Sequence, residues 1–307
     1  MIHHPAPTPA GDSWQRAFEA FLAEKLRRSG SRRTVETYAG LLRQCFGTLG
    51  KTPEQVRSQD VFTWAYANGP SGRVPSASTV AARIAGISSF YHFLIRMGLL
   101  QANPCDALER PRPTPGRPRG LTAAEVTRLL HALPDSPAGL RDSAIILTLV
   151  LTGRRRAEVL GLKAGDVSWD GDHVFYHYHG KGGKEGQREL PPPAWEAIQR
   201  ALLAWGRTWE RMAPGDSLWP GHGTPGISSG TFYARLQRYF AGAGLPPAGV
   251  HIFRHTAAKL RRKAGASLED VSHFLDHSSL AVTSVYLQRL ESPHDTGWGS
   301  VAQAIGL

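Results

Sequence analysis

A proline-rich segment near the middle of the chain separates two parts with different sequence patterns. Residues 109–120 contain four prolines and four arginines. Proline has no backbone N–H to donate and disfavours helix and sheet, so this segment favours an extended linker. We expect a helical domain at residues 12–110, a linker at 111–120 and a second domain at 121–297. Residues 1–11 are also rich in proline and are expected to be disordered.

The first half of the chain carries only helical patterns. Apolar residues recur every three or four positions in four stretches, which begin near Ser13, Val35, Ser58 and Ser76. Gly98 supplies a stop signal after the last stretch. No alternation typical of strands appears, so we expect a small all-helical domain.

The second half combines helical patterns with one stretch of strand-like alternation. Thr122 and Glu125 form a capping box that starts the first helix. Residues 173–190 alternate apolar and polar positions around a glycine-rich turn, which predicts a hairpin or a short sheet. Further helices are expected at about 140–151, from about 155, and at about 194–212, 229–242, 253–264, 268–275 and 280–290. The predicted fold is therefore mainly α, with a small β-sheet or hairpin in the second domain.

The chain is strongly basic, with 36 Lys and Arg against 25 Asp and Glu and a formal net charge of +11. The excess is spread over both halves, which favours a polyanionic partner that both halves contact. No apolar run approaches the roughly 20 residues that cross a bilayer, and the first residues lack the pattern of a signal peptide. We therefore expect a soluble cytoplasmic protein with no membrane partner. Cys45 and Cys105 support neither a disulfide framework nor a cysteine metal site.

Three arginines follow a Thr-Gly pair at 152–153. Arg155 falls at a predicted helix start, where the guanidinium and the helix N-terminus both favour a phosphate. Glu158, one turn later, can hold that side chain in place. Arg154 and Arg156 are expected to face solvent or to contact the backbone. A solvated arginine cluster is the simpler alternative for this motif taken alone.

A second group of candidates lies near the end of the chain. His251 and Arg254 are three positions apart at a helix start, so they share one face, where they suit a phosphate oxyanion and a proton transfer. His255 is expected to pack inward or to cap the helix. His277 follows a helix end, and Tyr286 falls two turns into the next predicted helix, at a spacing that is usual for a core tyrosine.

The remaining basic candidates lie in a turn and in the linker. Lys181 and Lys184 belong to the glycine-rich turn, where either ammonium can reach a leaving oxygen, and spacing alone does not choose between them. This is not a Walker loop, because no Gly-Lys-Ser/Thr leads into a helix. Arg112, Arg117 and Arg119 in the linker can follow a phosphate backbone or act as solvated spacer charges.

Three histidines, at positions 173, 177 and 179, alternate along the predicted strand. Three histidines can bind zinc, but no adjacent carboxylate or cysteine completes such a site in the sequence. No metal and no cofactor are therefore expected.

Taken together, the motifs resemble the tyrosine recombinase, or phage integrase, family in its compact Xer-like or mobile-element form. The family's TGxRxxE box is similar to residues 152–158, and its HxLRH box to residues 251–255, with Phe253 in place of Leu. Its LGH element is similar to residues 275–277, with Asp276 in place of Gly. The resemblance covers essentially the whole chain, with a SAM-like core-binding domain first and an α+β catalytic domain second.

The resemblance implies an enzyme that recombines DNA without metal or ATP. Tyr286 would attack a scissile phosphate, form a 3′-phosphotyrosine and free a 5′-hydroxyl, which Lys181 would protonate as it leaves. The six catalytic residues implied are Arg155, Lys181, His251, Arg254, His277 and Tyr286, with Glu158 supporting Arg155 and with Arg112, Arg117, Arg119 and Lys184 on the DNA. Asp276 can raise the pKa of His277.

The implied partners are double-stranded DNA and a homotetramer on two DNA sites, with or without a partner recombinase. Residues 298–307 are apolar enough to dock on a neighbouring protomer, or alternatively to fold back on their own domain. A type IB topoisomerase-like relaxing enzyme and a catalytically silent DNA-binding accessory protein are the alternative functions.

Overall fold

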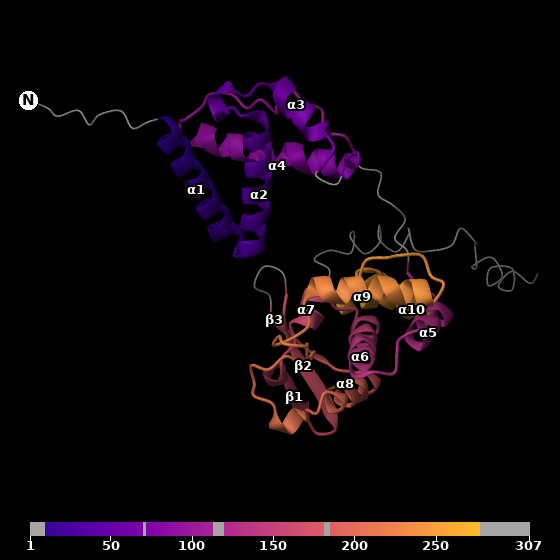
Figure 1. Cartoon of the computed structure of the whole chain (residues 1–307). Coiled ribbons are helices and arrows are strands. Elements are labelled where there is room, and N and C mark those ends of the chain that lie inside the picture. The colour runs from indigo at the N-terminus through magenta and orange to yellow at the C-terminus, as the bar shows by residue number, and fades with distance from the viewer. Residues whose placement is uncertain (1–9, 70–71, 113–119, 181–184, 277–307) are drawn as a thin grey trace, which may run out of the picture. The chain divides into compact units, whose positions relative to one another are not determined.

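The computed structural model describes residues 10–69, 72–112, 120–180 and 185–276. The chain divides into two compact units, residues 1–116 and 117–307, and the division falls within the proline-rich segment. Figure 1 shows the helices and strands of each unit. Within the described ranges, no helix has both the length and the apolar character that crossing a bilayer requires.

The described part of unit 1 is helical, as predicted. Its elements are α1 (Ala10–Ser29), α2 (Arg32–Leu49), the 3-10 helix η1 (Pro53–Gln55), α3 (Ser58–Tyr66) and α4 (Ala77–Arg96). Local signals set the ends of α2: Ser31 accepts a hydrogen bond from the Thr34 N–H, and Gly50 ends the helix with a φ of 61°. Helix α1 begins at Ala10, slightly ahead of the position where the apolar pattern begins.

Aromatic rings form much of the core of unit 1. Phe18 stacks on Phe90 with ring centroids 4.7 Å apart, and Phe21 meets Phe90 edge to face at 5.2 Å. Arg83 is also buried, and it donates hydrogen bonds to the carbonyls of Ala65 and Ala67 at 2.9 and 2.7 Å. These bonds satisfy backbone acceptors at the end of α3 that the helix itself leaves unpaired.

Unit 2 combines helices with a small antiparallel sheet. Its elements are α5 (Ala123–His131), α6 (Pro137–Thr152), α7 (Arg156–Leu160), η2 (Ala164–Asp166), β1 (Val167–Asp170), β2 (His173–His179), β3 (Glu185–Glu189), α8 (Pro192–Ala204), η3 (Trp209–Arg211), α9 (Ser229–Gly242), α10 (Ile252–Lys263) and α11 (Leu268–Phe274). The predicted capping box starts α5, because Thr122 and Glu125 bond each other's backbone N–H at 2.8 and 3.2 Å.

The sheet has the strand order β1-β2-β3, and both pairings are antiparallel. Tyr176 pairs with Arg188, and Tyr178 pairs with Gly186. Val174, Tyr176 and Tyr178 are buried on one face, as the predicted alternation requires. The fold class is confirmed, and β1 is an addition that the alternation did not reveal, because only Val167 in this strand is buried.

One predicted helix of unit 2 is shorter than expected. The pattern at 194–212 predicts a single helix, whereas α8 ends at Ala204 and the separate 3-10 helix η3 follows. Gly206, with a φ of 67°, interrupts the helical backbone between them. The predicted helix at 280–290 lies outside the described residues.

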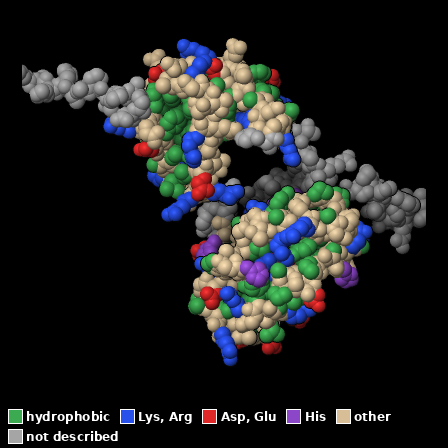
Figure 2. All heavy atoms as spheres, viewed as in Figure 1, with side chains coloured by type: hydrophobic (Ala, Val, Ile, Leu, Met, Phe, Trp, Pro, Cys, Tyr) green, Lys and Arg blue, Asp and Glu red, His purple; other side chains and the backbone are tan. Residues whose placement is uncertain are grey.

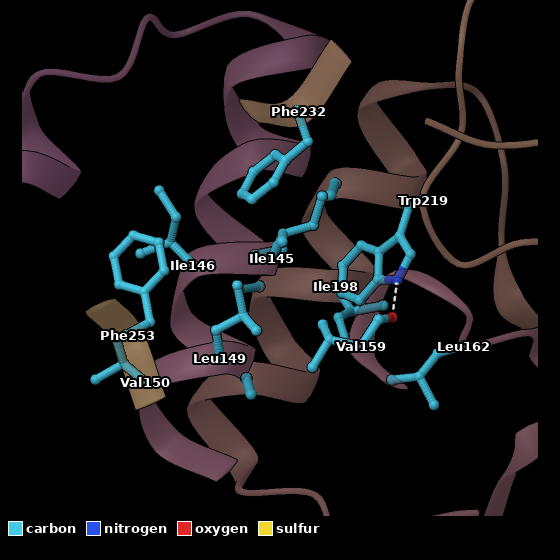
Figure 3. Close-up of a cluster of buried hydrophobic side chains, with 14 of the residues drawn as sticks. Ile145, Ile146, Leu149, Val150, Val159, Leu162, Ile198, Trp219, Phe232 and Phe253 are labelled. Atoms are coloured by element: carbon cyan, nitrogen blue, oxygen red, sulfur yellow. Dashed lines mark hydrogen bonds between the residues drawn. The ribbon is translucent and has the colours of Figure 1, made fainter. Parts of the chain in front are cut away.

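Helix α6 lies at the centre of the core of unit 2. It packs against α8 and α10, and Figure 3 shows Leu149 and Val150 among the side chains of this cluster. Trp219 is fully buried, and its indole N–H donates to the Val159 carbonyl of α7 at 2.5 Å. The core therefore fixes the end of α6, the short α7 and the start of α10, which carry the arginine and histidine motifs.

Candidate active site

Five of the unit 2 residues that the family resemblance singles out lie in the described part of the chain. Arg155 and Glu158 lie at the start of α7, His251 and Arg254 at the start of α10, and Asp276 just after α11. The other candidates in this part of the chain fall outside the described residues: Arg117, Arg119, Lys181, Lys184, His277 and Tyr286. In unit 1, Arg112 is exposed.

Gly153 lets the first motif approach α11 closely. It ends α6 in the left-handed conformation, with a φ of 63°, and its N–H donates to the Leu149 carbonyl. A Cβ at this position would lie 2.5 Å from Cε1 of Phe274 and 3.1 Å from Cδ2 of Leu275. Glycine is therefore required for two reasons, the backbone conformation and the space taken by α11.

Glu158 holds Arg155 in place, as the spacing predicts. Nη1 of Arg155 donates to Oε1 of Glu158 at 2.9 Å, and the backbone N–H of Arg155 donates to Oε2 at the same distance. The Glu158 side chain is 3% exposed, whereas that of Arg155 is 38% exposed. A buried carboxylate thus orients a guanidinium that remains open to a ligand.

Arg254 joins the two ends of the site. Its side chain is buried, and it donates from Nη1 to the Gly153 carbonyl at 2.8 Å and from Nη2 to the Leu275 carbonyl. Gly153 belongs to the first motif and Leu275 to the last one. One guanidinium therefore brings together segments more than 100 residues apart in the sequence.

The two histidines at the start of α10 differ in their surroundings. His251 is exposed, and desolvation together with the positive charges of Arg254 and Arg155 lowers its pKa. His255 is half-buried, with its ring 4.9 Å from that of His251, and burial lowers its pKa to about 4. His255 thus packs inward as expected, and both rings are neutral near pH 7.

Of the two expectations for Arg154, that it faces solvent or that it contacts the backbone, the first is wrong. Its side chain is 1% exposed, and it donates hydrogen bonds to the Phe274 carbonyl and to the carboxylate of Asp276. Asp276 also accepts hydrogen bonds from Tyr178 and Arg188. The substitution of Asp for Gly in the LGH element was visible in the sequence, but its partners were not, because they come from distant elements.

Two histidines of β2 contact carboxylates of the neighbouring strand, and the sequence did not reveal these pairs. Strand β3 brings Glu189 to 3.1 Å from Nδ1 of His173 and Glu185 to 3.1 Å from Nδ1 of His179. Each of these glutamates contacts one histidine. Even so, no three His, Cys, Asp or Glu side chains of the described part of the chain are grouped to hold a metal ion.

The fold and the motifs define a two-domain protein of the integrase type, and sequence comparison agrees. The Phage integrase family matches residues 119–292, and the Phage integrase, N-terminal SAM-like domain matches residues 17–98. The chain therefore belongs to the phage integrase family.

Known proteins resemble the chain over nearly its whole length. The tyrosine recombinase XerC of Xanthomonas campestris pv. campestris (strain B100) is 28% identical over 287 residues, which cover 91% of this chain and 85% of that protein. A lambda integrase dimer bound to a COC′ core site has a TM-score of 0.70 at 21% identity, over 93% of this chain and 98% of that one. A lambda integrase tetramer bound to a Holliday junction has a TM-score of 0.68 at 20% identity, over 91% of this chain and 77% of that one.

Proposed function

We propose that this chain is a site-specific DNA recombinase that cuts and rejoins duplex DNA through a 3′-phosphotyrosine on Tyr286. The observation that carries the proposal is the meeting of the motifs around Arg254, whose guanidinium bonds the carbonyls of Gly153 and Leu275. These contacts support a single site built from residues that are dispersed in the sequence. The tyrosine recombinases among the chain's relatives support the same reaction.

In the proposed reaction, the phenolic oxygen of Tyr286 attacks the scissile phosphorus, and the bond from phosphorus to the 5′ oxygen breaks. Arg155 and Arg254 stabilise the negative charge on the phosphorane, and one such contact is worth roughly 10²–10³ in rate. His251 is neutral near pH 7 and can accept the phenolic proton. His277 shares the stabilisation of charge.

The leaving 5′ oxygen needs a proton, which Lys181 or Lys184 supplies, and Lys181 is the first candidate by its place in the family pattern. General-acid catalysis of this kind typically contributes about 10²–10⁴-fold. The phosphotyrosine conserves the bond energy, so the 5′-hydroxyl of another strand can attack it and reseal the DNA. The reaction needs neither a metal nor a nucleotide cofactor.

The proposed partner is double-stranded DNA, contacted by Arg112, Arg117, Arg119 and Lys184. Figure 2 shows Lys and Arg side chains on the visible face of both units, in keeping with the net charge of +11. By analogy with the lambda integrase tetramer, we propose a tetramer on two DNA sites, with this chain alone or with a partner recombinase, acting in the bacterial cytoplasm.

Covalent capture of DNA from cells tests the proposal. Protein is recovered under denaturing conditions, and attached DNA is sequenced, for the wild type, for Tyr286→Phe and for Tyr233→Phe, which changes an exposed tyrosine of α9. We expect adducts at a defined site in the wild type and in Tyr233→Phe, and none in Tyr286→Phe. Adducts that persist in Tyr286→Phe, or that are absent from the wild type, contradict the proposal.

A further inference from the structure

The carboxylate of Asp276 receives hydrogen bonds from three side chains. Oδ2 accepts from Nη1 of Arg154 and from the Tyr178 hydroxyl, and Oδ1 accepts from Nη2 of Arg188 at 2.9 Å. The backbone of Asp276 has a φ of 49°, the only positive φ of a non-glycine residue in the described part of the chain. A non-glycine residue in the left-handed conformation that three side chains hold in place points to a functional role.

These three partners come from separate elements. Arg154 lies between α6 and α7, directly before Arg155, while Tyr178 and Arg188 lie on β2 and β3. Asp276 therefore ties the start of α7 to both strands of one hairpin. In the sequence, Lys181 follows Tyr178 by three residues and Lys184 precedes Arg188 by four, and both lysines lie outside the described residues.

The surroundings favour an ionised Asp276. Arg154 is almost completely buried, and its Cζ atom lies 4.8 Å from the centroid of the Tyr178 ring. A buried guanidinium needs a counter-charge, and Asp276 is the carboxylate that contacts it. Burial alone would raise the pKa of Asp276, but hydrogen bonds from Tyr178 and Arg154 and the charges of Arg154 and Arg188 lower it.

The contact between Tyr178 and Asp276 also depends on a glycine in the opposite strand. Gly186 pairs with Tyr178, and a Cβ at position 186 would lie 2.5 Å from the Tyr178 hydroxyl oxygen. A side chain there would displace that hydroxyl from the carboxylate. The absence of a side chain at Gly186 thus leaves room for the Tyr178 hydroxyl to donate to Asp276.

We propose that Asp276 is a positioning residue that fixes the β2–β3 hairpin, and with it the lysine that protonates the leaving oxygen, relative to Arg155. This inference rests on the proposed function. A general acid must come within hydrogen-bonding reach of its target, and misplacement by about 1 Å can cost about 10²-fold in rate. An anchor that joins both strands to the residue beside Arg155 restricts that displacement.

A substrate that needs no general acid tests the role directly. The variant Asp276→Asn keeps the size of the side chain and tolerates a left-handed backbone, but it removes the charge. Single-turnover cleavage is measured on a DNA site with an ordinary scissile phosphate and on the same site with a 5′-bridging sulfur. A thiol has a pKa of about 8.5 and leaves without a proton, whereas an alcohol requires one.

We expect Asp276→Asn to cleave the ordinary site about 10²-fold more slowly than the wild type and the sulfur site less than about threefold more slowly. The affinity of Asp276→Asn for a single DNA site should stay within about threefold of that of the wild type. Asp270→Asn is the matched control, because this exposed carboxylate on α11 bonds only Ser267 in the contacts described, and it should cleave both substrates normally.

A second variant, Tyr178→Phe, tests the same inference if Asp276→Asn does not fold. Tyr178→Phe removes one hydroxyl and no charge, and it should slow the ordinary site by roughly 3–10-fold with recovery on the sulfur site. Equal losses on both substrates, or normal cleavage of the ordinary site by both variants, overturn the inference. Absence of a wild-type adduct on both substrates contradicts the proposed function instead.

Discussion

Single residues at the start of α10 differ in their access to solvent and in their protonation. Arg254 is 3% exposed and is fixed by two backbone carbonyls, whereas His251 is open to a ligand. His255 lies between these extremes, and its pKa of about 4 makes it a neutral ring in the folded protein. Its protonation is therefore linked to stability.

The pKa of His255 predicts the pH dependence of unfolding. Because about 4 lies below the ordinary value of 6.5, the unfolded chain binds more protons between these pH values, and stability rises with pH across this window. The contribution is complete above pH 6.5 and is lost as the pH falls towards 4. We expect the free energy of unfolding of unit 2, measured in urea, to fall between pH 7.5 and 4.5. The fall should be about 1–2 kcal/mol larger for the wild type than for His255→Gln. Equal losses in the two proteins would contradict this assignment.

Residue types and their order were sufficient to predict the contact of Glu158 with Arg155, because a helix start places positions three apart on one side. They were not sufficient to predict the contact of Arg154 with Asp276. Its partner Asp276 is 122 positions away, and only the tertiary fold brings the two side chains together. Ion pairs between distant segments leave no periodic signal in one sequence.

At the scale of elements, the contact between the end of α6 and α11 depends on Gly153. Replacement by Ala places a Cβ 2.5 Å from the Phe274 ring, whereas the same change at Gly171, which also has a positive φ, meets no atom within 4 Å. Both changes strain the left-handed backbone, so their difference isolates the clash. We expect Gly153→Ala to be about 1–3 kcal/mol less stable than Gly171→Ala. Thermal unfolding measures this difference, and equal melting temperatures would show that α11 can shift without cost.

Element types were predicted better than element ends. The helices of unit 1 and the hairpin follow from apolar periodicity, and Thr122 and Glu125 mark a helix start that the structure confirms. The end of α8 was missed, because apolar residues continue past the break at Gly206. Strand β1 was missed because it is short and buries one side chain. The spacing of apolar residues indicates which side of an element is buried. This signal is weak where a helix or strand is short or interrupted.

At the scale of the whole molecule, positive charge occurs on both units and the chain continues beyond the described residues. The resemblance predicted the family and the order of its two domains, and the comparisons confirm both. The roles of Lys181, His277 and Tyr286 stay predictions, because these residues lie outside the described part of the chain.

The assembly on DNA is predicted to depend on residues 298–307. This segment also lies outside the described residues, and its apolar side chains at 298, 301, 305 and 307 suit docking on a second protomer. We expect its deletion to weaken tetramer formation on two DNA sites and to leave binding to a single site unchanged. Sedimentation of complexes with one and with two sites measures the two effects separately, and unchanged assembly would favour a segment that folds back on its own domain.

The carboxylate at position 276 also restricts how this protein can be re-engineered. Exchanging residues 275–277 for the Leu-Gly-His of the family pattern would remove the counter-charge of a buried arginine, so the exchange would leave Arg154 without its carboxylate. Chimeras with relatives should therefore carry positions 154, 178, 188 and 276 across together. In this chain, residues 275–277 can therefore be exchanged with those of a relative only together with the side chains that contact Asp276.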